Sequence, residues 1–377
     1  MRLGIDGREL VAGARTGIGR YVREVVRAAS ARGWRCLVYG DARTALSETP
    51  PGATLTRLAS VGTRWWDQIA LPRALERDGA DVFLSPYYKA PVAAPCPVVL
   101  TIHDLYFIGY RGRFIGRDGR RSLRDVALTA AARLYARRAR AIVTDSEHAR
   151  RAVVERLGVD PARVTAIGVA VGAEFVPTPL TEHARARYRL GPSYVLSVGN
   201  FMPHKNVDGL LRAWAALSPS LRSAHRLVLA GGDTARRPPL EALARGLDVT
   251  ASVILPGRID DADLPALYGG CAAFVLPSLD EGFGLAAVEA MACGAPVIVS
   301  DRGALPEVVG TGAAVVDIGA EGALTEALAR VLREPEHRDS LRRRGRARAA
   351  DFAAERTTAR VLDLLETIAG AAVAVAR

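Results

Sequence analysis

The residues best suited to chemistry lie in one stretch, residues 277–296, where two carboxylates frame a glycine-bearing loop. Glu281 stands at the mouth of this loop, and Glu289 follows after seven intervening residues. Gly282 and Gly284 lie between an apolar run and a short helical pattern, and glycine lets the backbone approach a ligand closely. A helix that begins directly after the loop would present free N–H groups to a pyrophosphate. The two carboxylates could then accept hydrogen bonds from separate hydroxyls of one extended ligand.

Lysine is rare in this chain, and one lysine occupies a position that suits phosphate binding. Of the 51 lysine and arginine residues, only Lys89 and Lys205 are lysines, so nearly all of the basic residues are arginines. Lys205 follows a predicted strand and precedes a helical pattern that Asn206 would cap. A compact ammonium there would neutralise a diphosphate leaving group.

These residues need a scaffold that brings strand ends and helix starts to one edge, and the first part of the chain has such a pattern. Short apolar runs alternate with amphipathic helical patterns, which favours parallel β–α–β units. The predicted strands are 2–5, 35–39, 82–84, 98–102 and 141–144, and the predicted helices are 19–32, 65–77, 124–138 and 146–157.

A segment with two prolines and no periodicity, residues 175–181, separates this part from a second pattern of the same kind. The predicted strands there are 194–198, 226–230, 253–255, 273–276, 297–299 and 314–316, and the predicted helices are 206–217, 239–247, 261–268, 285–292, 321–332, 336–348 and 352–365. We therefore expect an α/β protein of two doubly wound parallel-sheet domains, with a cleft between the carboxyl ends of their sheets.

Length and composition agree with two domains. The chain has 377 residues, of which 49% are hydrophobic, enough for two cores. We expect an N-terminal domain over 1–176, a second domain over 182–350 and a C-terminal helix over 351–377 that packs back on the first domain. The chain contains no long uncharged apolar run and its start does not resemble a signal peptide. Its four cysteines have no metal-binding spacing, which favours a cytoplasmic protein with reduced thiols.

The stretch 277–296 resembles the retaining glycosyltransferases of family 4, which have the GT-B fold of two Rossmann-like domains. Their pattern of Glu, seven residues and Glu occurs within a Glu-Gly-Phe-Gly loop and a Glu-Ala-Met-Ala-x-Gly-x-Pro-Val helix end, as it does here. The resemblance implies that Glu281 binds the hydroxyls of the donor sugar and that Glu289 binds the donor ribose. It also implies that Lys205 binds the donor diphosphate. The loop residues expected to contact the donor are Gly282, Phe283, Gly284 and Leu285.

The resemblance extends to weaker motifs elsewhere. The loop 13–21, with Gly17, resembles the family's N-terminal glycine loop, which would close over the donor. His103 follows a predicted strand in Thr-Ile-His-Asp and would contact the donor sugar and the acceptor side, and Arg258 and Ile259 would hold the nucleotide base. This chain departs from the family at Asn200, where many relatives have an arginine, so the second positive charge on the diphosphate falls in part to the neighbouring His204.

The family resemblance implies transfer of a hexose from a nucleoside diphosphate sugar to an acceptor hydroxyl, with retention of configuration. It also implies that the domain over 1–176 binds the acceptor and that the domain over 182–350 binds the nucleotide sugar. The lysine-containing loop and the Thr-Ile-His-Asp segment resemble bacterial mannosyltransferase-like members, so GDP-mannose is the first donor to consider and UDP-sugars the second. Other GT-B enzymes, such as a sugar-nucleotide epimerase or a phosphorylase, are alternatives. So are an NAD(P)-dependent oxidoreductase, for which the glycine pattern of loop 13–21 is incomplete, and a non-catalytic sugar-binding module.

No metal or other cofactor is expected. The carboxylates around Asp261 match a metal motif of a different glycosyltransferase fold, but they precede a helical pattern and are interpreted as capping acids. The net charge is +11, and residues 111–140 hold ten arginines and two aspartates. A solvated face is the plain interpretation of this segment, and contact with a lipid-linked or other anionic acceptor at the inner face of the membrane is the alternative. Without a recognition motif, nucleic acid is not an expected partner.

Overall fold

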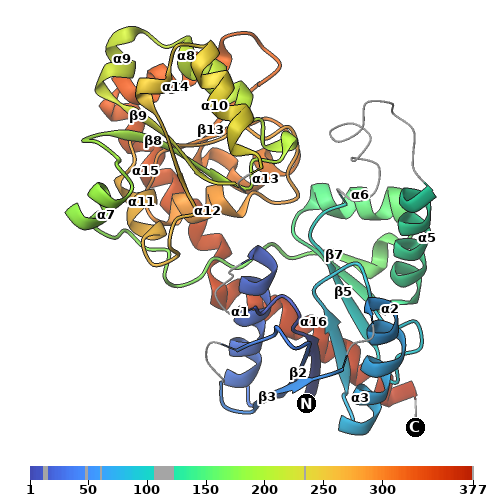
Figure 1. Ribbon diagram of the computed structural model, residues 1–377. Coiled ribbons are helices and arrows are strands. Elements are labelled where there is room, and N and C mark those ends of the chain that lie inside the picture. Colours follow the sequence, from blue (N-terminus) through green and yellow to red (C-terminus); the bar gives the residue numbers. More distant parts are fainter. Residues whose placement is uncertain (12–15, 47–49, 60–61, 106–122, 233–234, 376–377) are drawn as a thin grey trace. The chain divides into compact units, whose positions relative to one another are not determined.

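The computed structural model describes residues 1–11, 16–46, 50–59, 62–105, 123–232 and 235–375. The chain forms two compact units. Unit 1 comprises Met1–Gly172 together with Ala354–Arg377, and unit 2 comprises Ala173–Ala353. The predicted linker 175–181 therefore begins unit 2, and the C-terminal helix belongs to unit 1 (Figure 1).

Unit 1 is built on a seven-stranded sheet in the order β3-β2-β1-β4-β5-β6-β7, and its strand pairs are parallel. The strands are β1 Arg2–Asp6, β2 Arg35–Gly40, β3 Ala53–Arg57, β4 Val82–Ser85, β5 Val98–Ile102, β6 Ala141–Thr144 and β7 Val164–Ala166. The helices are α1 Gly17–Ala31, α2 Thr63–Trp65, the π-helical turn η1 Trp66–Ala70, α3 Leu71–Asp78, α5 Leu123–Arg138, α6 Glu147–Leu157, the 3₁₀ turn η2 Pro161–Arg163 and α16 Ala354–Val375. Strands β3 and β7 are absent from the sequence prediction.

Apolar residues of unit 1 form one core on each face of the sheet, as expected for a doubly wound domain. On one face, Leu3 and Ile5 of β1 pack with α1 and α16, and Val361, Leu362 and Leu365 of α16 are buried there. On the other face, Leu100 and Ile102 of β5 pack with α3, α5 and α6. Helix α16 thus completes the core of unit 1 beside α1 (Figure 1).

Unit 2 is built on a six-stranded parallel sheet in the order β10-β9-β8-β11-β12-β13. The strands are β8 Tyr194–Gly199, β9 Arg226–Gly231, β10 Val253–Gly257, β11 Ala273–Leu276, β12 Val297–Ser300 and β13 Ala314–Val316. The helices are α7 Glu182–Arg187, α8 Val207–Ala215, α9 Pro219–Ala224, α10 Arg237–Gly246, α11 Leu264–Gly270, α12 Leu285–Ala292, α13 Leu305–Val309, α14 Ala323–Arg333 and α15 Pro335–Ala349. Short 3₁₀ turns are η3 Pro203–Lys205, η4 Thr250–Ser252, η5 Gly310–Gly312 and η6 Ala350–Phe352. Helices α7, α9 and α13 are absent from the prediction.

Two capping predictions in unit 2 are wrong. Asn206 has a left-handed backbone (φ 53°) and makes no capping hydrogen bond; its side chain donates instead to the carbonyl oxygen of Pro277 (3.1 Å). The residues around Asp261 form a turn, and α11 begins only at Leu264. The preceding Asp263 makes no capping bond either, because its carboxylate accepts from the Tyr188 hydroxyl (2.7 Å).

Candidate functional site

The loop between β11 and α12 holds Glu281 in a fixed position. The hydroxyl of Ser278 donates to Oε1 of Glu281 (2.7 Å), and the carbonyl oxygen of Glu281 accepts from the N–H of Ala304 (2.9 Å). Gly303 lies so close that a Cβ atom there would come within 2.5 Å of the Glu281 nitrogen. Only glycine fits this approach, and Glu281 is 7% exposed as a result of the close packing.

Lys205 meets Glu281, although the two residues are far apart in the sequence. The Nζ atom of Lys205 donates to Oε1 of Glu281 over 2.6 Å, with the two side chains 20% and 8% exposed. Strand β8 leads into the short turn that carries Lys205, and the N–H of Leu279 bonds the carbonyl oxygen of His204 (2.7 Å), which ties the two loops together. A half-buried ammonium and a buried carboxylate therefore share one site, which we call the lysine–glutamate site.

The N-terminus of α12 lies in the same loop and provides the expected anion-binding groups. Gly284 precedes the helix with φ 91° and gives no side-chain cap, and the first bond within the helix joins the N–H of Ala287 to the carbonyl of Gly284. The N–H groups of Leu285 and Ala286 therefore have no partner within the helix, as is usual for a helix start. Such groups and the helix dipole favour a phosphate.

Glu289 is buried one turn further along α12. It is 3% exposed, and its Oε2 atom accepts from the hydroxyl of Tyr268 (3.3 Å). Tyr268 is itself fully buried in α11, and the sequence pattern there gave no sign that its hydroxyl would meet Glu289. The carboxylate predicted to bind ribose is thus oriented by a neighbouring helix.

The other residues of unit 2 that were predicted to contact the donor include Asn200, Arg258, Ile259 and Phe283. Asn200 is exposed, and its side-chain oxygen accepts from the N–H of Met202 (3.2 Å), so it shapes its own loop. Arg258 is exposed and Ile259 is buried. Phe283 is buried in edge-to-face contact with Phe352 (5.2 Å between ring centres), so its side chain serves packing.

His204, which was expected to share the second positive charge on the diphosphate, is partly buried beside Lys205. Burial, and after it the neighbouring ammonium of Lys205, lowers the pKa of His204. Both effects disfavour the protonated imidazole when no anion is bound. Among the residues predicted to bind the donor, Lys205 is the cation that pairs with Glu281.

In unit 1, His103 lies just beyond β5 and is held by a residue that the sequence did not single out. Its Nδ1 atom is 2.8 Å from Oδ2 of Asp145, which follows the neighbouring strand β6, and its ring meets Tyr21 edge to face. Burial lowers the pKa of His103, but the Asp145 carboxylate outweighs it, so the pKa is raised overall. Among the described residues, the buried Nε2 atom has no hydrogen-bond partner.

The N-terminal glycine loop is described only from Thr16 onward, and residues 12–15 lie outside the described residues. Gly17 is exposed and begins α1, whose N-cap is Thr16, with its hydroxyl accepting from the N–H of Gly19 (2.9 Å). A Cβ atom at Gly19 would come within 2.9 Å of the Glu9 carbonyl oxygen, so this glycine permits close packing of the loop. The basic segment 111–140 likewise lies outside the described residues as far as residue 122.

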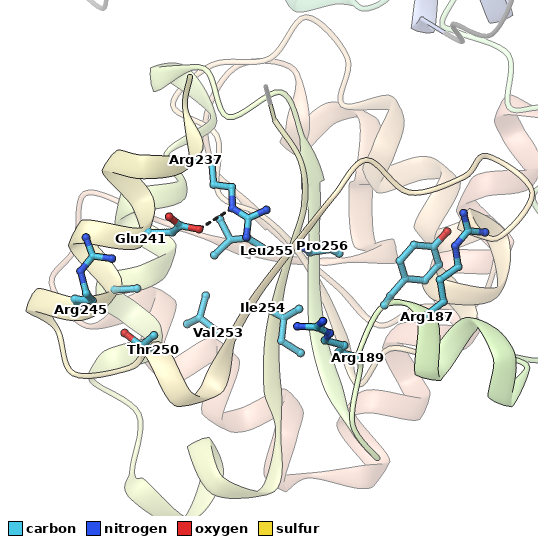
Figure 2. A pocket seen from close by; sticks show the side chains of 12 residues that line it. Arg187, Arg189, Arg237, Glu241, Arg245, Thr250, Val253, Ile254, Leu255 and Pro256 are labelled. Atoms are coloured by element: carbon cyan, nitrogen blue, oxygen red, sulfur yellow. Dashed lines mark hydrogen bonds and ion pairs between the residues drawn. The ribbon is translucent and has the colours of Figure 1, made fainter. Parts of the chain in front are cut away.

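A separate hollow of about 730 Å³ lies along the edge strand β10 of unit 2. Figure 2 shows that Arg187, Arg189, Arg237 and Arg245 surround it, with Glu241 paired to Arg237. Its lining contains neither residue of the lysine–glutamate site nor the start of α12. The hollow therefore does not coincide with the predicted donor site, which is identified by the Lys205–Glu281 pair instead.

Two Rossmann-like units of parallel strands, one with a lysine–glutamate pair beside a helix N-terminus, define a protein of the GT-B class. Residues 181–348 match the family "Glycosyl transferases group 1" and residues 15–174 match "Glycosyltransferase Family 4". The chain belongs to glycosyltransferase family 4. Within the described residues no helix has the length and apolar character needed to cross a bilayer.

Curated relatives match over part of their length. The chain is 31% identical to O-antigen chain mannosyltransferase B of Escherichia coli over 60% of each chain. It is 35% identical to a D-inositol 3-phosphate glycosyltransferase of Salinispora arenicola over 56% of this chain and 51% of that one. The matched part is thus about half to three fifths of these relatives.

Solved structures with the same fold cover nearly the whole chain. Sucrose-phosphate synthase from Thermosynechococcus elongatus matches with a TM-score of 0.79 and 22% identity, over 98% of this chain and 99% of that one. Anabaena HepE in complex with UDP-glucose matches with a TM-score of 0.74 and 18% identity, over 97% and 99%. At these identities the similarity establishes the GT-B fold.

Proposed function

We propose that this protein is a retaining glycosyltransferase that moves a hexose from a nucleoside diphosphate sugar to an acceptor hydroxyl. The observation that carries the proposal is the lysine–glutamate site beside the N-terminus of α12. It combines a cation and free N–H groups suited to a diphosphate with a carboxylate suited to sugar hydroxyls. Family membership supports transfer over the epimerase and oxidoreductase alternatives.

The ion pair explains how one site would serve both ends of the donor. When the diphosphate arrives, its charge competes with Glu281 for the Lys205 ammonium. Glu281, still held by Ser278, is then free to accept hydrogen bonds from the sugar. Glu289, oriented by Tyr268, would accept from the ribose hydroxyls. Binding thus replaces one set of charge-assisted bonds by another, which limits the cost of desolvating these groups.

The transfer step needs no covalent enzyme intermediate. The bond between the anomeric carbon and the phosphate oxygen breaks while the acceptor oxygen bonds to that carbon from the same face. The acceptor proton passes to the departing phosphate oxygen. Lys205 and the N–H groups of Leu285 and Ala286 stabilise the charge that develops on the diphosphate, and His103 helps to orient the sugar.

For the donor we propose GDP-mannose first and a UDP-sugar second. Two kinds of relatives support this order, since mannosyltransferases from Escherichia coli match the sequence and HepE, which has the same fold, is known with UDP-glucose. No cofactor is proposed besides the sugar nucleotide. For the acceptor, we propose a glycan or other small molecule, with a lipid-linked form at the cytoplasmic face of the membrane. The exposed Val126 and Leu134 of α5 support such a peripheral contact.

The test begins with a thermal-shift screen of GDP, UDP, ADP and TDP, because a ligand that binds the native state raises its apparent stability. The nucleotide that binds is then supplied as its mannose and glucose donors, and nucleotide release is followed with and without a mixed pool of sugar acceptors. We expect release that depends on the acceptor and an α-linked product from an α-linked donor. Release without any new glycoside would instead indicate an epimerase or a hydrolase.

A further inference from the structure

The edge strand β10 of unit 2 leaves apolar side chains partly exposed, whereas an inner strand of the same sheet buries them. Strand β10 lies at the end of the sheet, with β9 as its neighbour. Val253, Ile254 and Leu255 of β10 are each half-buried, while residues 194–197 of the inner strand β8 are buried. At a sheet edge, alternate residues direct their N–H and C=O groups away from the neighbouring strand. The edge of β10 therefore presents hydrogen-bond donors, acceptors and apolar surface together.

The hollow of about 730 Å³ follows this edge, since its lining includes the consecutive β10 residues 253–256. Its volume lies in the range of ligand pockets, roughly 300–1,000 Å³. Figure 2 shows that Arg237 and Arg245 of α10 lie on one side of the strand. Arg187 and Arg189, at the end of α7, lie on its other side. The hollow thus holds four arginines and one carboxylate, a lining that favours a negatively charged ligand.

Two of the four arginines are paired within the protein, and the other two are available to a ligand. Arg237 donates to a glutamate of α10 (2.6 Å), and Arg187 is paired with the carboxylate of Asp260 (2.7 Å). The side chains of Arg189 and Arg245 are exposed and have no hydrogen-bond or ion-pair partner within the part of the chain that the structure describes. One of these two arginines lies on each side of β10. A ligand that binds both must present negative charge to both sides of the strand.

The backbone conformation at Arg189 favours glycine, so local structure does not explain an arginine at this position. Arg189 follows Tyr188, the C-cap of α7, and has φ 55°. Its N–H bonds the carbonyl oxygen of Ala186, and the N–H of Leu190 bonds that of Arg185, which is the Schellman pattern of a helix end. A left-handed conformation costs a residue other than glycine about 1–2 kcal/mol. A charged side chain thus occupies this position at an energetic cost, and it lines the hollow.

The sheet edge distinguishes an extended peptide from a small anion as the ligand. The outward C=O groups of β10 are acceptors, whereas a fully ionised carboxylate or phosphate accepts hydrogen bonds and donates none. An added peptide strand both donates to such an edge and accepts from it, so that its main chain supplies affinity. Consecutive residues of a strand point to opposite faces of the sheet. Two successive acidic residues would therefore reach Arg189 on one side and Arg245 on the other.

We propose that the edge of β10 is a docking site for an extended acidic segment of a partner protein, which adds a strand to the sheet of unit 2. The outward main-chain groups of residues 253–255 pair with the backbone of that segment. Arg189 and Arg245 bind carboxylates on its two faces, and its apolar side chains cover the half-buried residues of β10. The docking site is separate from the lysine–glutamate site and does not depend on the proposed transfer reaction.

The test compares three labelled peptides on the full chain by fluorescence polarisation. The first consists of repeats of Val-Glu-Glu, the second replaces every glutamate by glutamine, and the third carries an N-methyl group on every valine. Because successive valines are three residues apart, these methyl groups remove donors from both edges of the peptide. We expect the first peptide to bind, and the other two to bind about tenfold or more weakly.

Equal binding of the first and third peptides would show a purely electrostatic contact, which overturns strand addition. Equal binding of the first and second peptides overturns the role of the arginines. No binding of the first peptide overturns the docking site itself, and the arginines would then serve only to keep the sheet edge from pairing with other chains.

Variants of the two available arginines separate peptide binding from stability. Glycine is favoured at φ 55°, so Arg189→Gly should be at least as stable as the wild type in denaturant unfolding, while its affinity for the first peptide falls about fivefold or more. Arg245→Gln should weaken binding to a similar extent. Arg343→Ala, a change of an exposed arginine of α15 outside the hollow, is the matched control and should leave the affinity unchanged. Wild-type affinity in both hollow variants contradicts the proposal.

Discussion

The lysine–glutamate site of unit 2 and the cluster of Arg8 with Asp6 and Asp67 in unit 1 hold their charges in different ways. In unit 2 the cation is paired with a single carboxylate, and the side chain of Lys205 is 20% exposed. In unit 1 the cation is held by two carboxylates and an aromatic face. A cation with one partner can exchange that partner for a phosphate, whereas a cation with two cannot without stranding a buried charge. The comparison therefore indicates that the number of partners of a buried cation decides whether that cation is available to a phosphate.

Replacement of Lys205, the cation that can exchange its partner, should have the largest effect on activity. We expect Lys205→Ala to lower kcat/KM about 10²–10³-fold, because the charge that develops on the diphosphate loses its cation and Glu281 is left buried without it. Steady-state rates of nucleotide release measure this. Arg343→Ala, an exposed residue of α15, is the control for loss of a positive charge. Wild-type activity in Lys205→Ala would break the comparison, because the two clusters would then not differ in phosphate chemistry.

The backbone beside the lysine–glutamate site should be the next most sensitive feature. Gly284 has φ 91°, and a Cβ atom there would lie 2.4 Å from Cδ2 of Leu305. We expect Gly284→Ala to lower the free energy of unfolding by about 1–3 kcal/mol. Gly246→Ala is the control, since Gly246 ends α10 at negative φ with no atom near its added Cβ. Denaturant unfolding of both variants is the measurement, and equal stabilities would show that the start of α12 is not constrained as described.

Unit 1 also contains a titratable pair, His103–Asp145, which can be compared with the Lys205–Glu281 pair of unit 2. The carboxylate raises the pKa of His103 against the opposing effect of burial, so the pair stabilises the fold at pH values below the ordinary histidine pKa. This contribution disappears as the pH rises through the raised pKa. We expect Asp145→Asn to lower kcat/KM about tenfold and to shift the histidine titration to lower pH.

NMR titration of the His103 ring and melting temperatures at several pH values measure these effects. The stability difference between wild type and Asp145→Asn should be greater at low pH than at high pH. His148→Gln, a change of another histidine in the same unit, controls for general effects of histidine. If the pKa of His103 in Asp145→Asn equals that of the wild type, the contact between the two residues contributes packing but no charge interaction.

The smallest expected effect is that of metal removal. Among the described residues, no group of three or more histidine, cysteine or acidic side chains could hold a metal ion. If Lys205 and the α12 N-terminus carry the diphosphate charge, EDTA should change the rate of nucleotide release less than about twofold. Rates before and after dialysis against EDTA, with magnesium or manganese added back, measure this. A rate that requires the added ion would show that the cation of unit 2 is insufficient alone.

The sequence was most informative where the needed residues are contiguous. The predicted bounds of β11, α12 and β13 agree with the structure, because a buried apolar run, a glycine loop and a terminal glycine mark each boundary. Glu281, Glu289 and Gly284 all lie within one such stretch. The assignment of Lys205 and Glu281 to one donor site followed from a family resemblance rather than from any local pattern, and the ion pair between them was not predicted.

Other features could not be predicted because their signal is not local. Strands β3 and β7 lie at the two edges of the sheet, so few of their residues are buried and neither strand contains an apolar run. Asp145 and Asp67 acquire their roles only when separate strands and turns meet at one edge. Asn206 was predicted as a helix cap from its type, but the neighbouring loop offered its side chain a carbonyl oxygen instead.

Because the last helix, α16, belongs to unit 1, the two units differ in when they can complete their folding. Unit 2 is one continuous segment, whereas unit 1 lacks Val361, Leu362 and Leu365 of its core until α16 has left the ribosome. We expect unit 2 to reach its native state without α16, whereas unit 1 keeps an uncovered apolar face until α16 packs on it. A chain stopped before residue 354 should therefore bind a hydrophobic dye through unit 1 and still show the melting transition of unit 2. Dye binding equal to that of the full chain would show that unit 1 folds without its last helix.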